Sequence, residues 1–275
     1  MLRSLYSGVS GMRGFQTKLD VIGNNIANVN TVGFKGGRVM FKDILSQTVS
    51  GVTAPDGNDS GGVNAKQIGL GVALSSIDTV HTPGSAMTTN VPTDLRIDGD
   101  GFFVVRAGED TNYLTRAGNF TVDTNRNMVN ADGLQVLDSE GRAIIIPEGV
   151  TAFSIASDGT IIAVQEDGTS APTEYKIAVV KVANPGGLEK IGGNLYRVTP
   201  NANPEGTLDL GGDNSTANNP VIGTGAIVSG QLEMSNVDLT AEFTEMIVAQ
   251  RGFQANSRII TTSDEILQEV VNLKR

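Results

Sequence analysis

The stretch LTAEFTEMIVAQRGFQANSRIITTSDEILQEVVNLKR, residues 239–275, decides how this chain can fold. Its apolar side chains recur at steps that are sums of three and four, which is the period of an amphipathic α-helix rather than of a β-strand. Polar residues at Gln250, Ser257 and Asp264 interrupt the apolar stripe. Such a helix has to bury its stripe against another part of the chain or against another molecule. The stripe contains Leu239, Phe243, Met246, Phe253, Ile260, Leu267 and Val271.

A second amphipathic helix is predicted near the other end of the chain, over about residues 4–28. Gly8, Gly11 and Gly14 lie within it, and each interior glycine costs a helix roughly 0.5–1 kcal/mol relative to alanine. We therefore expect a helix that forms only when packed and that approaches another helix closely; the alternative is that the glycines have no role. The apolar residues at helical spacing are Leu2, Leu5, Val9, Met12, Phe15, Leu19, Ile22, Ile26 and Val29.

Asparagines gather where this first helix is expected to end. Asn24, Asn25, Asn28 and Asn30 are followed by Gly33. Asparagine and glycine are the residues that best accept the left-handed conformation at a helix end. We interpret them as capping and turn residues, and a ligand-binding asparagine cluster is the alternative.

The middle of the chain passes from loop patterns to strand patterns. Residues 33–89 are the least regular part, and residues 50–67 have loop composition throughout. From about residue 95 to residue 231, short apolar runs are separated by Asp-Gly pairs, which favour the tight turns of antiparallel strands. The predicted fold class is therefore α+β: an antiparallel β-rich central domain with long N- and C-terminal α-helices that pack as a coiled-coil-like core. The Asp-Gly pairs begin at Asp98, Asp132, Asp158 and Asp167.

The composition argues against several functions. A net charge of −10 and a pI near 4.6 argue against a nucleic-acid partner, because no basic stripe could neutralise phosphates. The chain has no cysteine, which removes disulfides, thiolate zinc sites and cysteine nucleophiles. Its one histidine, His81, is interpreted as a loop residue rather than a ligand or a base. No catalytic, metal-binding or cofactor-binding residue is assigned.

Two acidic stretches match a calcium loop only in part. The run DGDG at residues 98–101 lacks the remaining ligand positions. The run DTNRN at residues 123–127 begins like a calcium-binding loop, but Met128 occupies the position that requires glycine and Leu134 the position that requires glutamate. Both runs are interpreted as turns.

Neither a membrane span nor a signal peptide is expected. No segment approaches about 18 consecutive apolar residues. The N-terminal sequence MLRSLYSGVSGMRGFQTKL has no continuous apolar run of signal-peptide length and no small-residue cleavage site. We therefore expect no membrane insertion, and export, if it occurs, without a cleaved signal peptide.

Several separated motifs resemble those of the flagellar rod and hook proteins. LDVIGNNIANVNTVGFKGG, residues 19–37, resembles the family's N-terminal signature, and residues 235–275 resemble its C-terminal signature. QIGLGV at 67–72, LRIDGDGFFVV at 95–105 and YLTRAGNFTVD at 113–123 resemble its internal segments, in the same order. The resemblance covers most of the chain. Its N-terminal motif includes Asn24, Asn25, Asn28, Gly33 and Phe34.

Within this family the sequence motifs are most similar to those of hook proteins, of the compact type found in Gram-positive bacilli. The resemblance implies a subunit of the flagellar hook that polymerises into a flexible helical tube and transmits torque from rod to filament. It implies contacts with copies of itself, with the flagellar rod, hook cap and hook–filament junction proteins, and with the flagellar type III export apparatus. The implied location is the hook and basal body of the flagellum, outside the cell.

The resemblance also implies a division of the chain. Residues 1–32 with 236–275 would form a helical core domain, residues 33–75 a connecting extended or loop segment, and residues 76–235 a β-rich outer domain. The implied assembly residues are Leu5, Val9, Met12, Leu19, Ile22 and Ile26 of the first helix and Phe243, Met246, Phe253, Ile260 and Leu267 of the last.

Two other functions remain open. The chain is short for a hook protein, which keeps a distal rod subunit of the flagellar basal body as the alternative. A more remote alternative, from a different class, is a secreted β-rich adhesin or polysaccharide-active protein. That last function predicts a stable monomer whose binding or hydrolysis survives the loss of both terminal helices.

Overall fold

The fold is α+β, as predicted from the sequence. The computed structural model describes residues 2–55, 61–108, 111–165, 169–204, 208, 210–211 and 215–273. The chain divides into two compact units. The first, here called the helical unit, comprises Met1–Ala27, Gly37–Thr79 and Asp238–Arg275, and the second, here called the β-domain, comprises Asn28–Gly36 and Val80–Val237.

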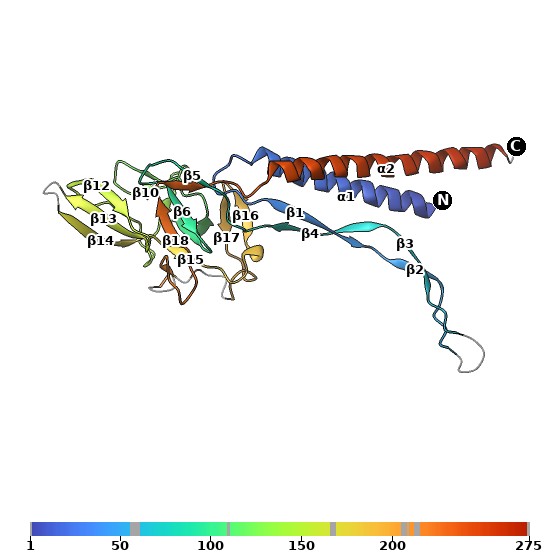
Figure 1. Cartoon of the computed structure of the whole chain (residues 1–275), viewed down its shortest axis with the longest axis horizontal. Helices are drawn as coiled ribbons and strands as arrows, with labels where there is room; N and C mark the ends of the chain where they lie inside the picture. The colour runs from blue at the N-terminus through green and yellow to red at the C-terminus, as the bar shows by residue number, and fades with distance from the viewer. Residues whose placement is uncertain are drawn as a thin grey trace. The chain divides into compact units, whose positions relative to one another are not determined.

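Two long helices lie side by side in the helical unit, α1 (Leu2–Ala27) and α2 (Leu239–Asn272) (Figure 1). They run antiparallel. At 1.5 Å per residue, the 26 residues of α1 extend about 39 Å and the 34 residues of α2 about 51 Å. The start of α2 is set by Asp238, whose carboxylate accepts a hydrogen bond of 2.8 Å from the backbone N–H of Thr240. This is an N-cap, which satisfies an N–H group that the helix itself leaves unpaired.

Glycines permit the close approach of the two helices. A Cβ atom added to Gly8 would lie 3.3 Å from Ile260, and one added to Gly11 would lie 2.7 Å from the side-chain amide of Asn256. The approach is reciprocal, because a Cβ atom on Gly252 of α2 would lie 2.6 Å from the ring of Phe15. The predicted close helix–helix contact is confirmed at Gly8 and Gly11. Gly14 differs, since it faces the ring of Phe41 in the neighbouring strand at 3.0 Å.

Two antiparallel strand pairs, here called the ribbon, complete the helical unit. Strand β1 (Gly37–Asp43) pairs with β4 (Val72–Thr79), and β2 (Ser46–Ser50) pairs with β3 (Lys66–Gly69). We expected a loop or an extended connection here. The sequence gives little sign of strands because every residue of β2 and β3 is exposed, so no apolar face marks them. Part of the predicted loop at residues 50–67, namely 56–60, lies outside the described residues.

The β-domain is built from antiparallel sheets. The largest has the order β16-β17-β8-β7-β11-β10-β9, with β15 also paired to β7; β12-β13-β14 form a second sheet, and β18-β6 and β19-β5 form pairs. The strands are β5 (Ala86–Thr88), β6 (Leu95–Asp98), β7 (Phe102–Arg106), β8 (Asn112–Thr115), β9 (Thr121–Val122), β10 (Met128–Val129), β11 (Gln135–Val136), β12 (Val150–Ile155), β13 (Thr160–Gln165), β14 (Ser170–Lys176), β15 (Val179–Val180), β16 (Glu189–Gly192), β17 (Leu195–Arg197), β18 (Ala226–Ser229) and β19 (Gln231–Glu233).

Strand β7 supplies both halves of the β-domain core. Successive side chains of a strand point to opposite faces. Phe103 and Val105 pack into one apolar cluster, while Phe102 and Val104 pack into another, and all four are buried. Burial on both faces explains why the run FFVV is continuously apolar instead of alternating.

Turns follow the Asp-Gly pairs. Gly99, Gly133 and Gly159 have φ of +121°, +80° and +82°, which is the region that favours glycine. The fourth predicted turn, at residues 167–168, falls outside the described residues. Neither of the described helices is long and apolar enough to cross a membrane.

Candidate assembly surfaces

The predicted assembly residues of α1 mostly face the inside of the helical unit. Ile22 is buried, whereas Val9 is exposed on the side away from α2. The remaining four are partly buried: Leu5, Met12, Leu19 and Ile26. Most of this apolar face is therefore already covered within one chain.

The contact face of α2 includes Met246, Ile260 and Leu267 of the predicted apolar stripe but not its two phenylalanines. Phe243 and Phe253 are 48% and 37% exposed, while the fully buried residues of the helix are Ala249 and Ser263. Small side chains let α1 approach closely, so the contact face combines small residues with apolar ones. The spacing of small residues along the helix was the signal that could have located this face. The contact face runs through Met246, Ala249, Gly252, Asn256, Ile260, Ser263 and Leu267.

Large apolar side chains of α2 remain exposed on either side of the contact face. One row of five residues is here called the outer strip. Its successive members are 11, 7, 4 and 3 positions apart in the sequence, so they lie on one side of the helix. Phe243, Phe253 and Val271 are exposed on the other side. Extended exposed apolar surface on a soluble protein marks an interaction site. The outer strip is Val248, Ile259, Ile266, Val270 and Leu273.

Asn25 joins three elements of the helical unit. Its amide N–H donates to the carbonyl of Gly37 at 2.8 Å and to the carboxylate of Glu242 at 3.0 Å, and its oxygen accepts from the N–H of Gly37 at 2.9 Å. Burial raises the pKa of Glu242, and the hydrogen bond from Asn25 opposes this rise. An ion pair between Lys18 and Glu245 adds a further link between α1 and α2. Asn25 therefore holds α1, β1 and α2 together.

The other motif asparagines lie in the last turn of α1 and in the turn that follows it. Asn24 is exposed. Asn28 accepts hydrogen bonds from Thr31, through its backbone carbonyl at 3.1 Å and through its side chain at 3.2 Å. These contacts fit the turn role that the sequence favours.

The motif residues Gly33 and Phe34 belong to the β-domain. Gly33 has φ of +68°, and a Cβ atom added to it would lie 2.5 Å from the backbone nitrogen of Ala117. Phe34 is buried, and the ammonium group of Lys190 lies 4.0 Å from the centre of its ring. Burial lowers the pKa of Lys190. Glycine is therefore required at position 33 both by backbone conformation and by space.

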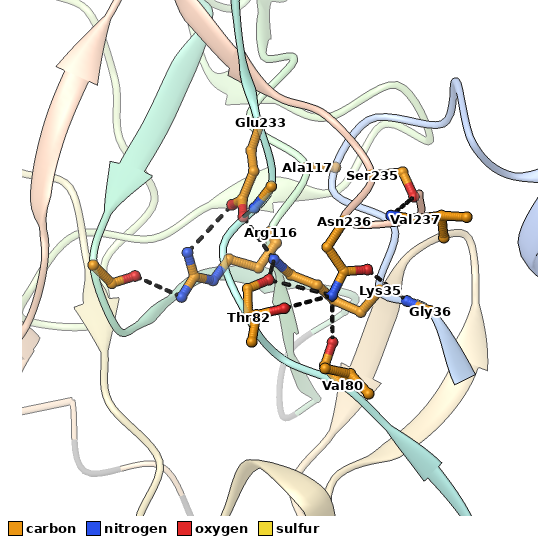
Figure 2. A network of polar contacts seen from close by, with 12 residues as sticks. Lys35, Gly36, Val80, Thr82, Arg116, Ala117, Glu233, Ser235, Asn236 and Val237 are labelled. Atoms are coloured by element: carbon orange, nitrogen blue, oxygen red, sulfur yellow. Dashed lines mark hydrogen bonds and ion pairs between the residues drawn. The ribbon is translucent and has the colours of Figure 1, made fainter. Parts of the chain in front are cut away.

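A buried ionic cluster follows immediately after this motif (Figure 2). The ammonium of Lys35 lies 2.6 Å from one carboxylate oxygen of Glu233, and the guanidinium of Arg116 lies 3.2 Å from the other. The three side chains are at most 3% exposed. Desolvation lowers the pKa of Lys35, although Glu233 acts in the opposite direction. One carboxylate thus compensates two buried cations.

Polar side chains extend this cluster to the two segments that precede β1 and α2. Asn236 accepts from the N–H of Gly36 at 2.8 Å and donates to the carbonyl of Val80 at 2.8 Å (Figure 2). Lys35 donates to the carbonyl of Thr82 at 2.8 Å. The chain before β1 and the chain before α2 are therefore fixed to each other within the β-domain. Sequence reasoning missed this cluster, although a lysine inside the glycine-rich run GFKGG was a signal for it.

His81 lies in a loop, as expected. Its ring packs edge-on against those of Phe102 and Tyr196, with centroid distances of 5.6 and 5.5 Å. Desolvation, together with the nearby charges of Lys35 and Arg116, lowers its pKa to about 4. Across the described residues, no group of three or more His, Cys, Asp or Glu side chains could hold a metal ion.

Comparison with protein families assigns three parts of the chain. Residues 5–35 match the family described as flagella basal body rod protein. Residues 96–163 match the D1 domain of the flagellar hook protein FlgE/F/G, and residues 228–273 match the C-terminal part of the flagellar basal body rod FlgEFG proteins.

Individual relatives agree with these families. The chain is 56% identical over 275 residues, covering all of both chains, to the flagellar basal-body rod protein FlgG of Bacillus subtilis. It is 36% identical to the FlgG rod protein of Borreliella burgdorferi, again over the full length of both. The flagellar hook protein FlgE of the same organism is 30% identical over an alignment of 453 residues that spans both chains. The chain belongs to the family of flagellar rod and hook axial proteins, a family of structural subunits.

Proposed function

We propose that this protein is a subunit of the distal rod of the flagellar basal body. The observation that carries the proposal is the 56% identity, over the full length of both chains, to a relative named as a rod protein. Relatives of equal length need no inserted outer domain, whereas the alignment with a hook protein needs 453 positions for this chain of 275 residues. The sequence resemblance favoured the hook; the comparisons favour the rod alternative.

In this proposal the protein acts mechanically and catalyses no reaction. Copies assemble through α1 and α2 into a tube that connects the motor to the hook and carries torque. The exposed apolar rows beside the contact face of α2 support this role, because assembly would remove them from water. The residues Leu5 to Ile26 and Phe243 to Leu267 named from the sequence then contribute in two ways. Those turned inward hold the helix pair, and those turned outward, such as Phe243 and Phe253, contact neighbouring copies.

The proposal includes the route to the assembly site and the neighbours there. Subunits pass through the flagellar type III export apparatus and join the growing rod, and the finished rod carries the hook. A helix weakened by glycines suits export of an unfolded chain, since α1 gains its stability only when it packs.

A hook subunit is the second candidate, supported by the hook relative that aligns with the whole chain. Electron microscopy of basal bodies from a strain lacking the gene separates the two. Loss of the distal rod, with the proximal rod present, is expected for a distal rod subunit. A complete rod without a hook would overturn the proposal in favour of the hook.

A further inference from the structure

A groove in the helical unit runs between α1 and the ribbon. Its cavity volume is about 590 Å³, within the range of pockets that bind ligands. Tyr6 and Val9 of α1 form one wall, and Ile44 and Leu74 form the other. All four side chains are exposed. The groove thus offers an open apolar surface that no residue of α2 lines.

The two walls of the groove are fixed to each other. The hydroxyl of Ser10 in α1 accepts a hydrogen bond of 3.3 Å from the N–H of Val72 in β4. The rings of Phe15 and Phe41 meet with a centroid distance of 6.2 Å. The groove is therefore formed before anything binds to it, so binding does not require the walls to be ordered first.

Two arginines give the groove a positive charge. Arg3 and Arg13 lie along its α1 wall, and among the described residues neither is within ion-pair distance of an acid. The first acidic residue of α1 is Asp20. An occupant with unpaired acidic side chains would therefore complement the groove.

The last part of α2, residues 259–273 and here called the distal segment, has the complementary properties. Its apolar row Ile259, Ile266, Val270 and Leu273 is exposed. Glu265 and Glu269 lie beside this row, and no Lys or Arg occurs between residues 261 and 273. Gly8 of α1 packs on Ile260, so the antiparallel helices place the start of α1 opposite residues near 266. The final residues of α2 therefore extend past α1 and have no helical neighbour among the residues that the structure describes in their own chain.

The lengths also match. The α1 wall of the groove runs from Arg3 to Thr17, which is 14 helical steps or about 21 Å. The distal segment spans the same 14 steps, from Ile259 to Leu273. We propose that the groove between α1 and the ribbon binds the distal segment of α2 from a second copy of this chain. The inference rests on the proposed function, because it concerns contacts between assembled subunits.

Such a contact joins two different surfaces of the same protein. A heterologous contact of this kind leaves one groove and one distal segment free at the two ends of any assembly, so it propagates instead of closing. The apolar row fills the groove, and Glu265 and Glu269 approach Arg3 and Arg13. The charges then favour this pairing over others that would place like charges together.

A charge-reversal cycle tests the pairing in cells that lack the chromosomal gene. One variant carries Arg3→Glu and Arg13→Glu, a second carries Glu265→Arg and Glu269→Arg, and a third carries all four changes. We expect each double variant to lower the number of complete rods at least about tenfold, because like charges across an interface cost several kcal/mol. We expect the fourfold variant to recover to within about twofold of wild type. The matched control Glu174→Arg, at an exposed position of the β-domain, should leave rod number unchanged.

Disulfide cross-linking provides a second measurement. Because the chain has no cysteine of its own, only the introduced thiols can form disulfides. Copies carrying Val9→Cys are mixed with copies carrying Ile266→Cys, so that a disulfide dimer can arise only between chains. The control pair Val221→Cys with Ile266→Cys, whose first site is 91% exposed in the β-domain, should not form a dimer.

Two results would overturn the inference. One is a fourfold variant that assembles no better than the weaker double variant. The other is normal assembly without a Val9–Ile266 dimer, or with a dimer to Phe243→Cys in its place. Neither of these results would contradict the proposed rod function. Conversely, a complete rod in the deletion strain would overturn the rod function, while a Val9–Ile266 disulfide dimer would still establish the groove contact.

Discussion

Removing the negative charge of Glu233 is expected to destabilise the β-domain strongly. The carboxylate compensates both Lys35 and Arg116, and all three side chains are almost completely buried. Glu233→Gln leaves two cations with no counterion. Breaking a buried ion pair by removing one partner costs about 3–5 kcal/mol, because the remaining charge stays desolvated. That is a large part of the roughly 5–15 kcal/mol that stabilises a typical domain.

The change should be measured by urea unfolding followed by tyrosine fluorescence. Three of the four tyrosines, Tyr113, Tyr175 and Tyr196, lie in the β-domain, and the chain has no tryptophan. In thermal unfolding, about 3–5 kcal/mol corresponds to a midpoint lowered by roughly 6–20 °C for a domain of this size.

The matched control is Glu189→Gln. Glu189 also pairs with an arginine, Arg197, but the two side chains are 53% and 58% exposed. Exposed pairs contribute about 0–1 kcal/mol. If Glu233→Gln cost no more than Glu189→Gln, the ionic cluster would not stabilise the domain and the reasoning would fail.

A pH series adds an independent condition. Without Glu233 the folded-state pKa of Lys35 should fall further below its ordinary value of 10.5. Between the two pKa values the unfolded chain binds more protons than the folded one, so stability rises with pH across that window. The deficit of Glu233→Gln should therefore shrink as the pH approaches 10.5. A deficit independent of pH would contradict the assignment of the uncompensated charge to Lys35.

Three further measurements test other parts of the structure. The single histidine, His81, should titrate by NMR near pH 4. The folded state should lose stability as the pH falls from 6.5 to 4, because only the unfolded chain binds that proton in this range. Titration near pH 6.5 would refute the burial of His81 beside two cations. Gly252→Ala should weaken α1–α2 packing by about 1–3 kcal/mol, and the better helix propensity of alanine should offset roughly 1 kcal/mol of that loss. The control Gly23→Ala, whose added Cβ meets open space, should only stabilise α1. Equal effects of the two variants on hydrogen exchange would show that the contact at Phe15 is absent. Gly33→Ala should cost the β-domain at least about 1–2 kcal/mol in urea unfolding, since it adds a clash with the backbone at residue 117 to a left-handed conformation, and an unchanged midpoint would contradict that conformation.

The sequence reveals features that depend on local pattern. Helical spacing located α1 and α2, and Asp-Gly pairs located turns at Gly99, Gly133 and Gly159. The predicted stripe included Met246, Ile260 and Leu267 of the contact face, but it missed Ala249 and Gly252, which pack closely because they are small.

Features that depend on distant residues were also missed. Strands β2 and β3 pair through their backbones and leave every side chain exposed, so they have no amphipathic pattern. The cluster of Lys35, Arg116 and Glu233 joins residues up to 198 positions apart. The lysine in the run GFKGG is a local sign of the cluster, but a single sequence does not show which distant charges that lysine meets.

The two units differ in how much of their apolar surface a single chain buries. In the β-domain, apolar clusters are buried on both faces of β7, and Glu233 compensates the buried charges of Lys35 and Arg116. In the helical unit, α1 carries interior glycines, and α2 leaves its outer strip and its final turns uncovered. Burial of an amphipathic face supplies most of a helix's stability. The helix pair therefore gains a substantial part of its stability when neighbouring copies cover the outer strip, which couples folding of the helices to assembly. Under the proposed function, a subunit would carry a stable β-domain before assembly, and contacts with neighbouring copies would then stabilise its helix pair further.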